Sequence, residues 1–245
     1  MPSLSKSTFS KIKSLGIKKF RDKYQLFVAE GITLVSDIQL SELKIRNVYA
    51  TRAWIDKNPE ASAVEVSVKD LGRLSGLKTP NQVLCVAEIP QYDFNPEKLN
   101  GLTLILDNIS DPGNMGTIIR TADWFGIEHI FCSLNSTDIY NPKVVQASMG
   151  SISRVRVHYV DLKSFFKSCK DKYPIYGLTM DGRSIYNEKI KPDSLLVIGN
   201  ESMGISTDLT TLLTDMIGIP AFGGAQSLNA AVATSIACYE YKRKN

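Results

Sequence analysis

The second half of the chain alternates short apolar runs with helix-length segments, and this alternation limits the possible folds more than any other feature. Each run is short enough for a buried strand. The runs lie at Leu102–Leu106, His129–Cys132, Val155–Tyr159, Ile175–Leu178, Leu195–Ile198 and Met216–Ile219. Buried strands separated by helices are typical of a mostly parallel sheet that is covered on both faces. We therefore expect an α/β fold in this part of the chain.

The first part of the chain predicts a smaller α/β unit of its own. Strands are expected at Gln25–Ala29, Asn47–Ala50 and Val83–Ile89, and helices at Ile32–Leu40 and Ser67–Ser75. A stiff polar stretch with a proline at each end, Pro90 and Pro96, then separates the two series. We predict a first domain over residues 1–92 and a second over residues 97–245, each long enough to bury a core.

Composition excludes several classes of protein. Hydrophobic residues make up 43% of the chain and charged residues 22%, as in globular proteins, which argues against disorder. The four cysteines lie far apart, and the two histidines are not at metal-ligand spacing, so we expect neither a disulfide framework nor a metal site. Without a membrane-length apolar run or a signal-peptide core, the sequence predicts a cytoplasmic protein with no membrane partner.

The basic residues gather near the start of the chain. Residues 1–30 carry seven lysines and arginines against two acidic residues, although the net charge of the whole chain is only +4. Such a bias is typical either of a surface that meets nucleic-acid phosphates or of a solvated helix face, and charge alone favours the solvated face. If the segment binds RNA, the side chains expected at the contact are Lys11, Lys13, Lys18, Lys19 and Arg21.

Three polar segments that contain glycine follow predicted strands of the second part. They cover residues 106–116, 199–204 and 219–229. Turns of this kind place polar side chains and free backbone N–H groups at the carboxyl edge of a parallel sheet, where open α/β folds bind ligands. Ordinary strand-end turns and a surface arginine at Arg120 are the alternative for each segment taken alone. No G-x-G-x-x-G or G-x-x-x-x-G-K-[ST] phosphate loop occurs.

The third of these segments runs straight into the last expected helix, Ser227–Lys242. We expect Ser227 to cap this helix, and Asn229 in the first turn can point its amide at a site built on the helix start. The positions at helical spacing on one face are Leu228, Ala231, Val232, Ser235 and Ile236.

Taken together, the three segments resemble the signature of the SpoU (TrmH-type) branch of the SPOUT RNA methyltransferases. The matching pattern is Asn114-x-Gly116-x-x-x-Arg120, then Gly199-Asn200-Glu201-x-x-Gly204, then Ile219-Pro220 and Ser227-Leu228-Asn229. The first part, with Arg21 in a basic helix, looks like the L30e/L7Ae-like substrate-binding domain of that family. The sequence departs from the common pattern at Ser202, where glycine is frequent, and at Gln226, where glutamate is frequent.

The resemblance implies a second domain with a C-terminal trefoil knot, a homodimer, and methyl transfer from S-adenosylmethionine to a ribose 2′-hydroxyl of RNA, rRNA in preference to tRNA. By position, it implies that the cofactor-binding residues are Thr179, Gly199, Asn200, Gly204, Ile219 and Leu228. It implies that the catalytic residues are Asn114, Arg120, Glu201, Ser227 and Asn229. No metal is implied.

The expected chemistry depends most on Arg120. The family's proposed mechanism gives this arginine a part in deprotonation, but a guanidinium is effectively always charged. We therefore expect Arg120 to hold the adjacent phosphate and to stabilise developing alkoxide charge, while Glu201 or a water takes the proton. Two other functions stay open: a non-catalytic RNA-binding protein that keeps the fold, and a knotted methyltransferase that acts on a base nitrogen.

Overall fold

The computed structural model describes residues 4–245, so the first three residues of the expected first domain lie outside the described part. The chain divides into two compact units. The first consists of Met1–Gln91 and Asp138–Ser153, and the second of Tyr92–Thr137 and Arg154–Asn245. The segment 138–153 therefore groups with the first unit although it lies inside the second expected domain. The domain boundaries at residues 92 and 97 stay a prediction.

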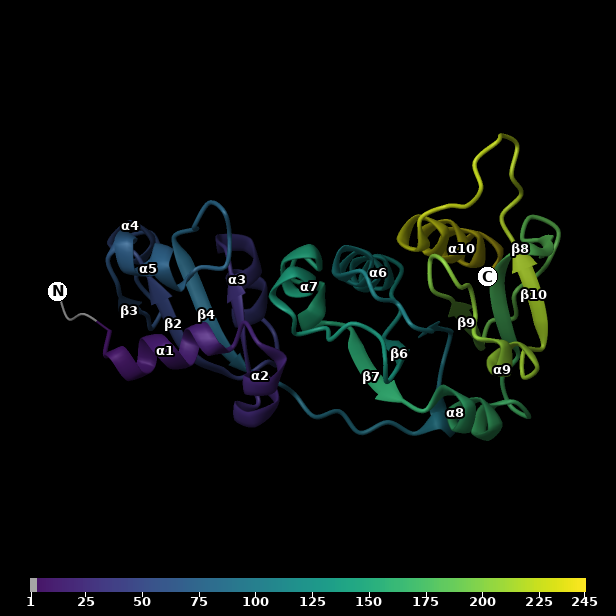
Figure 1. The fold of residues 1–245 in the computed structure, drawn as a ribbon, viewed down its shortest axis with the longest axis horizontal. Helices are drawn as coiled ribbons and strands as arrows, with labels where there is room; N and C mark the ends of the chain where they lie inside the picture. Colours follow the sequence, from purple (N-terminus) through teal and green to yellow (C-terminus); the bar gives the residue numbers. More distant parts are fainter. Residues whose placement is uncertain (1–3) are drawn as a thin grey trace. The chain divides into compact units, whose positions relative to one another are not determined.

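The first unit is built on a four-stranded sheet of order β1-β4-β2-β3 (Figure 1). Its strands are β1 (Leu26–Glu30), β2 (Ile45–Ala50), β3 (Val64–Glu65) and β4 (Val83–Glu88). Its helices are α1 (Lys6–Ser14), α2 (Lys18–Tyr24), α3 (Ile32–Gln39), α4 (Arg52–Ile55), α5 (Val68–Leu74) and α7 (Pro142–Ala147). Apolar residues of α1 and α5 pack on one face of this sheet, where Leu84 and Val86 of β4 are buried.

The second unit is a six-stranded sheet of order β10-β8-β9-β5-β6-β7, and every neighbouring pair is parallel. Its strands are β5 (Leu102–Leu106), β6 (His129–Ser133), β7 (Arg156–Val160), β8 (Ile175–Ser184), β9 (Ser194–Ile198) and β10 (Asp215–Gly218). All residues of the central strands β5 and β9 are buried, as continuous apolar runs predict. The expected α/β class and parallel sheet are confirmed, whereas the knot stays a prediction.

Helices cover this parallel sheet. They are α6 (Pro112–Trp124), α8 (Leu162–Cys169), α9 (Thr207–Thr210) and α10 (Ala230–Lys244). The apolar residues of α8 and α9 share one core with β5, β6, β8 and β9. In Figure 1, α6 and α10 lie side by side, and a hydrogen bond of 3.0 Å joins the Thr121 and Ser235 hydroxyls across them.

The last helix differs from its expected form in two ways. It begins at Ala230 with Asn229 as the N-cap, so the expectation that Ser227 caps the helix is wrong. Its buried face consists of Ala230, Ala231, Thr234, Ala237, Cys238, Glu240 and Tyr241, whereas Leu228 and Val232 are each 48% exposed. Small side chains let two helices approach closely, and for this reason the largest apolar residues did not mark the buried face.

Two further expectations can be compared with the structure. All four cysteines are buried and unbonded, and burial raises the pKa of Cys85 and of Cys238 to about 12, which keeps these thiols un-ionised. Among residues 4–245, no helix is long and apolar enough to span a membrane. The same residues contain no group of three His, Cys, Asp or Glu side chains that could hold a metal ion.

A pair of stacked histidines lies in the second unit, where burial lowers the pKa of both rings. His158 is buried, its ring centroid lies 4.8 Å from that of Phe131, and its Nε2 lies 3.1 Å from Nδ1 of His129. Burial, with the nearby His129 and Arg156, lowers the pKa of His158 from 6.5 to about 4. The folded chain thus keeps His158 neutral at pH values where the unfolded chain protonates it.

We predict that the protein loses stability as the pH falls from about 6.5 to about 4, because protons then bind the unfolded state preferentially. The variant His158→Phe keeps an aromatic ring in the stack and removes the titrating group. Its melting temperature should therefore fall less over this pH range than that of the unmodified protein. Equal pH dependence in the two proteins would show that His158 does not carry the effect.

Candidate active site

Three polar side chains from distant parts of the sequence form one hydrogen-bonded chain at the carboxyl edge of the parallel sheet. Asn229 Nδ2 donates to Asn114 Oδ1 over 2.8 Å, and Asn114 Nδ2 donates to Glu201 Oε1 over 2.5 Å. Asn114 lies in the first turn of α6, Glu201 in the loop after β9, and Asn229 at the start of α10. The chain of hydrogen bonds therefore joins all three polar segments of the second unit.

The direction of this chain is set by the start of α10. Asn229 Oδ1 accepts hydrogen bonds from the backbone N–H groups of Ala231 and Val232 at 2.9 and 3.2 Å, as an N-cap does. The Asn229 amide nitrogen must then face Asn114, whose own amide nitrogen must face Glu201. Glu201 is exposed, and its Oε2 has no hydrogen-bond partner among residues 4–245. One carboxylate oxygen is thus positioned and the other is free to accept a proton.

A buried carboxylate supports the two loops that carry this chain. Asp107, which directly follows β5, is 2% exposed and accepts hydrogen bonds from Ser206 N at 2.7 Å and Asn108 Nδ2 at 2.8 Å. Asn108 has a φ of 55°, and its carbonyl accepts a hydrogen bond from Asn200 Nδ2 at 2.8 Å. Sequence reasoning gave Asp107, Asn108 and Ser206 no role. The polar pair Asp107-Asn108 at the end of a buried strand was the signal available.

The loop after β9 is tight because Gly199 lies against Gly204. A Cβ added to Gly199 would fall 2.3 Å from the carbonyl carbon of Gly204 and 2.4 Å from the nitrogen of Ile205. Asn200 and Gly204 also exchange backbone hydrogen bonds of 3.0 and 2.9 Å, and Gly204 has a φ of +68°. Asn200 Oδ1 accepts hydrogen bonds from two backbone N–H groups of the same loop. The Asn200 side chain therefore braces the loop, and its predicted contact with a cofactor stays a prediction.

A second close approach lies at the end of the neighbouring strands. Between Met216 and Ile217 the register of β10 against β8 shifts, so that residues 178–182 of β8 have no partner in β10. A Cβ on Gly218 would fall 2.7 Å from the Thr179 carbonyl oxygen. The Thr179 hydroxyl is buried and has no hydrogen-bond partner among the described residues. A buried polar atom without a partner, in a residue whose backbone leaves no room for a Cβ at Gly218, fits a bound ligand such as S-adenosylmethionine.

The loop between β10 and α10 stands open. Residues 221–229 are all exposed, and Figure 1 shows this loop projecting away from the sheet in yellow. Ile219 at its start is half-buried, while Leu228 and Ser227 near its end are exposed. No hydrogen bond joins Ser227 to Asn114 or Glu201. The cofactor contacts expected of Ile219 and Leu228, and the catalytic role expected of Ser227, stay predictions.

Arg120 lies outside the hydrogen-bonded chain. It belongs to the exposed stripe of α6 that also contains Gly113, Thr117 and Trp124. Its guanidinium makes no hydrogen bond or ion pair with any residue between 4 and 245. Six helical residues place it about 9 Å along the axis from Asn114. The structure thus joins Asn114, Glu201 and Asn229 by hydrogen bonds and leaves Arg120 outside this cluster, unpaired among the described residues and exposed.

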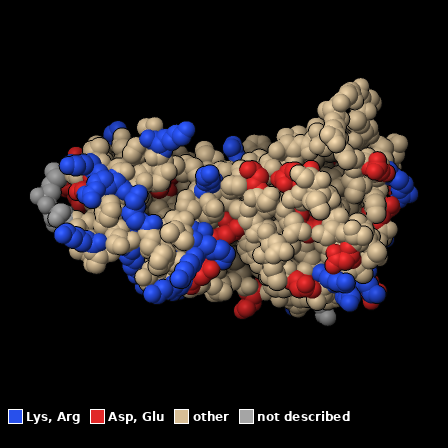
Figure 2. Space-filling view, viewed as in Figure 1, with Lys and Arg blue, Asp and Glu red and all other residues tan. Residues whose placement is uncertain are grey.

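The basic residues of the first unit divide into two groups. Lysine and arginine side chains gather over α1 and α2 in Figure 2, and Lys11, Lys13, Lys18 and Lys19 are exposed there. Arg21 is instead 2% exposed and donates to the Leu15 carbonyl at 2.8 Å and to Asp138 Oδ2 at 3.1 and 2.6 Å. The guanidinium donors of Arg21 are thus satisfied inside the unit, unlike those of the exposed lysines, and its contact with RNA stays a prediction.

Comparison with known families assigns the chain. The SpoU rRNA Methylase family matches residues 101–239, and the MRM3-like substrate binding domain matches residues 7–85. The fold and the polar cluster thus define an RNA methylase with an added substrate-binding unit. The chain belongs to the SpoU rRNA methylase family, and the expected family is confirmed.

Three similar proteins illustrate the relationship. The 23S rRNA (guanosine(2553)-2′-O)-methyltransferase of Bacillus subtilis is 29% identical over 94% of both chains. A solved structure of a TrmH-family protein from Porphyromonas gingivalis is 35% identical, covers 100% of both chains and has a TM-score of 0.90. An AdoMet-bound rRNA methyltransferase from Sinorhizobium meliloti is 27% identical, with a TM-score of 0.85 over 99% of this chain and 97% of that one.

We predict that Asn229→Ala lowers the free energy of unfolding by about 1 kcal/mol, because α10 loses its N-cap. Asn229→Asp keeps an oxygen at the cap and should leave the unfolding free energy close to that of the unmodified protein. It nevertheless removes the donor to Asn114. Urea denaturation of the unmodified protein and the two variants measures the three unfolding free energies. If Asn229→Asp were as destabilised as Asn229→Ala, capping would not be the stabilising part of this side chain's role.

Proposed function

We propose that the chain transfers a methyl group from S-adenosylmethionine to a ribose 2′-hydroxyl of rRNA. The observation that carries this proposal is the directed chain from Asn229 through Asn114 to Glu201, which ends in a free carboxylate oxygen next to the tight loop of Gly199. The names of the similar proteins, which include rRNA 2′-O-methyltransferases, support rRNA in preference to tRNA. A ribose hydroxyl needs a proton acceptor, and Glu201 offers one.

Each group of residues has a separate task in this reaction. The buried Thr179 hydroxyl and the backbones at Gly199 and Gly218 would hold the cofactor, which supplies a methyl group on a sulfonium leaving group. The protein's own contribution is to orient the 2′-hydroxyl, exclude water and remove the proton. Asn114 holds Oε1 of Glu201. Oε2 can therefore take the proton of the 2′-hydroxyl while the bond between the 2′-oxygen and the methyl carbon forms and the bond from that carbon to sulfur breaks.

Arg120 has a different task, because a guanidinium stays charged and is a poor base. Its free planar group on the exposed stripe of α6 can bind the phosphate next to the target ribose through two parallel hydrogen bonds. The same positive charge stabilises the negative charge that develops on the 2′-oxygen. A lysine at this position would supply the charge without the two-pronged geometry.

Two other functions are less well supported. A non-catalytic RNA-binding protein has no need for the Asn114–Glu201 contact or for the cradle at Gly199. Transfer to a base nitrogen would not require a carboxylate to remove the proton of a hydroxyl group. A cytoplasmic location fits four unbonded cysteines and stays part of the proposal.

We predict that the purified protein, with S-adenosylmethionine and rRNA lacking the modification, adds one 2′-O-methyl group, which nuclease digestion and mass spectrometry locate. Arg120→Lys should lower the rate constant about 100-fold or more, as the loss of a directed donor to developing charge does. Its affinity for S-adenosylmethionine, measured by calorimetry, should not change. Full activity in Arg120→Lys would contradict the role given to the guanidinium, and a methylated base nitrogen would contradict the proposed reaction.

The homodimer that the family resemblance implies is also part of the proposal. The exposed surface of α6 and α10 carries large apolar side chains: Trp124 is 84% exposed, Tyr239 58% and Val232 48%. The open loop that leads into α10 adds Phe222 at 90%. Large apolar side chains exposed on two neighbouring helices favour burial against another chain, and a second copy is the partner that we propose.

We predict that Trp124→Glu shifts the protein from dimer to monomer in sedimentation experiments, because a charge would be buried in the contact. Leu134→Glu is the matched control, since Leu134 is 66% exposed in the loop after β6. The control should sediment like the unmodified protein. A dimer that survives in Trp124→Glu would place the contact elsewhere.

A further inference from the structure

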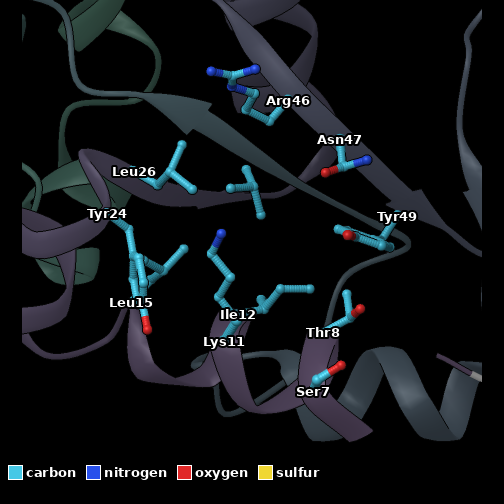
Figure 3. A pocket seen from close by; sticks show the side chains of 11 residues that line it. Ser7, Thr8, Lys11, Ile12, Leu15, Tyr24, Leu26, Arg46, Asn47 and Tyr49 are labelled. Atoms are coloured by element: carbon cyan, nitrogen blue, oxygen red, sulfur yellow. The ribbon is translucent and has the colours of Figure 1, made fainter. Parts of the chain in front are cut away.

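The first unit contains a cavity of about 510 Å³, whose lining includes none of the candidate active-site residues (Figure 3). It lies between α1, the end of α2, and residues of β1, β2 and β4. Its volume is in the range of ordinary small-ligand sites. Ile12, Leu26 and Val86 form its apolar floor, and they belong to the core of the unit. An aromatic ring could therefore stack on this floor, and the apolar surfaces of the ring and of the floor would both be shielded from water.

Positive charge is concentrated at this cavity. Its lining contains Lys11 and Arg46 and no acidic residue. Figure 3 shows the Lys11 ammonium pointing into the middle of the cavity, and it lies 4.9 Å from the centroid of the Tyr24 ring. No carboxylate pairs with Lys11 among residues 4–245, whereas Arg46 at the rim pairs with Glu88 over 2.6 Å. An anionic ligand would meet one unpaired ammonium and one guanidinium.

A bulge in β2 directs several polar side chains to the same cavity. The pairing of β2 with β4 shifts register between Ile45 and Asn47, so that Arg46 is an extra residue in the ladder. Residues that alternate along a regular strand point to opposite faces, but a bulge re-aims one of them. Arg46, Asn47 and Tyr49 can therefore all line the cavity.

The two uncharged members of this group are suited to hydrogen bonding. Asn47 is exposed, and its amide makes no hydrogen bond with the described residues. The Tyr49 ring is only 4% exposed, and burial raises the pKa of its hydroxyl, which therefore stays protonated at neutral pH. An amide and a hydroxyl offer both donors and acceptors, which is what the edge of a nucleobase requires.

We propose that this cavity binds one unpaired nucleotide of the RNA substrate, with its phosphate at Lys11 and Arg46, its base on the apolar floor, and its base edge at Asn47 and Tyr49. The inference rests on the proposed function, since it assumes that the substrate is RNA. A base within a duplex cannot enter, so the site selects RNA with an unstacked nucleotide. The other exposed lysines of α1 and α2, Lys13, Lys18 and Lys19, lie outside the cavity lining and supply affinity of a different kind, which depends on salt and not on sequence.

Binding of short RNA probes tests the proposal. The probes are fluorescein-labelled single-stranded RNA ten-mers of A, C or U and a blunt RNA duplex. Lys11→Met should weaken single-strand binding about tenfold, because the nucleotide phosphate loses one of its two cationic partners. Lys69→Met is the matched control, because Lys69 is exposed on α5 outside the cavity. This control should change single-strand affinity less than twofold, and both variants should bind the duplex alike.

Asn47→Ala tests the base contact separately. It should reduce the difference in affinity among the three ten-mers while leaving the salt dependence of binding unchanged, because it removes no charge. Ten-mers containing 4-thiouridine should cross-link to peptides that contain residues 7–12 or 46–49. Equal effects of Lys11→Met and Lys69→Met, or cross-links confined to other peptides, would overturn the proposal. Melting temperatures verify that each variant is folded.

The two proposals fail in distinguishable ways. If the unmodified protein methylates rRNA while the cavity variants keep the Michaelis constant for RNA, the cavity inference fails and the proposed function stands. If the unmodified protein neither binds S-adenosylmethionine nor methylates RNA, the proposed function fails, and the ten-mer binding still reports on the cavity. If both proposals hold, Lys11→Met raises the Michaelis constant for RNA and leaves the rate constant at saturating RNA unchanged.

Discussion

The candidate active site depends on how one amide is oriented at the start of a helix. The first N–H groups of α10 need acceptors, and Asn229 satisfies two of them with its oxygen. That single requirement leaves the amide nitrogen to point at Asn114, and it sets the polarity of every later contact up to Glu201. The N-cap hydrogen bonds, which any helix requires, therefore also determine how Glu201 is oriented in the loop after β9. The buried Asp107 carboxylate stabilises the same arrangement, because its hydrogen bonds join the loops after β5 and β9.

Much of this could be predicted from sequence where the pattern was long or the chemistry specific. The buried strands of the second unit follow from continuous apolar runs, and the three polar segments were expected at one sheet edge because parallel strands end there. Asn114, Glu201 and Asn229 meet as that reasoning suggests. The sequence alone cannot place the start of α10, because Ser227 and Asn229 are equally good caps; in the structure Asn229 is the cap, and its amide also donates to Asn114.

Other features could not be predicted because they depend on partners far away in the chain. Arg21 looked like one more basic residue of a charged segment, yet its guanidinium is held by Asp138, which lies 117 positions later. The bulges in β2 and β8 leave no mark in a pattern of apolar residues, since a single extra residue changes which side chains point where. Both bulges lie where we place a ligand, beside the cavity of the first unit and beside Thr179 in the second.

The buried ion pair between Arg21 and Asp138 determines which residues the first unit needs in order to fold on its own. A fragment cut at the linker around residue 91 would lose Asp138, the carboxylate that pairs with the buried guanidinium, together with the rest of segment 138–153. Removing one partner of a buried ion pair costs roughly 3–5 kcal/mol, a large part of the stability of a small domain. The first unit is therefore completed by residues 138–153, which in the sequence lie between the two stretches of the second unit. Recombination at residue 91 would therefore separate Arg21 from the carboxylate of Asp138 that pairs with it.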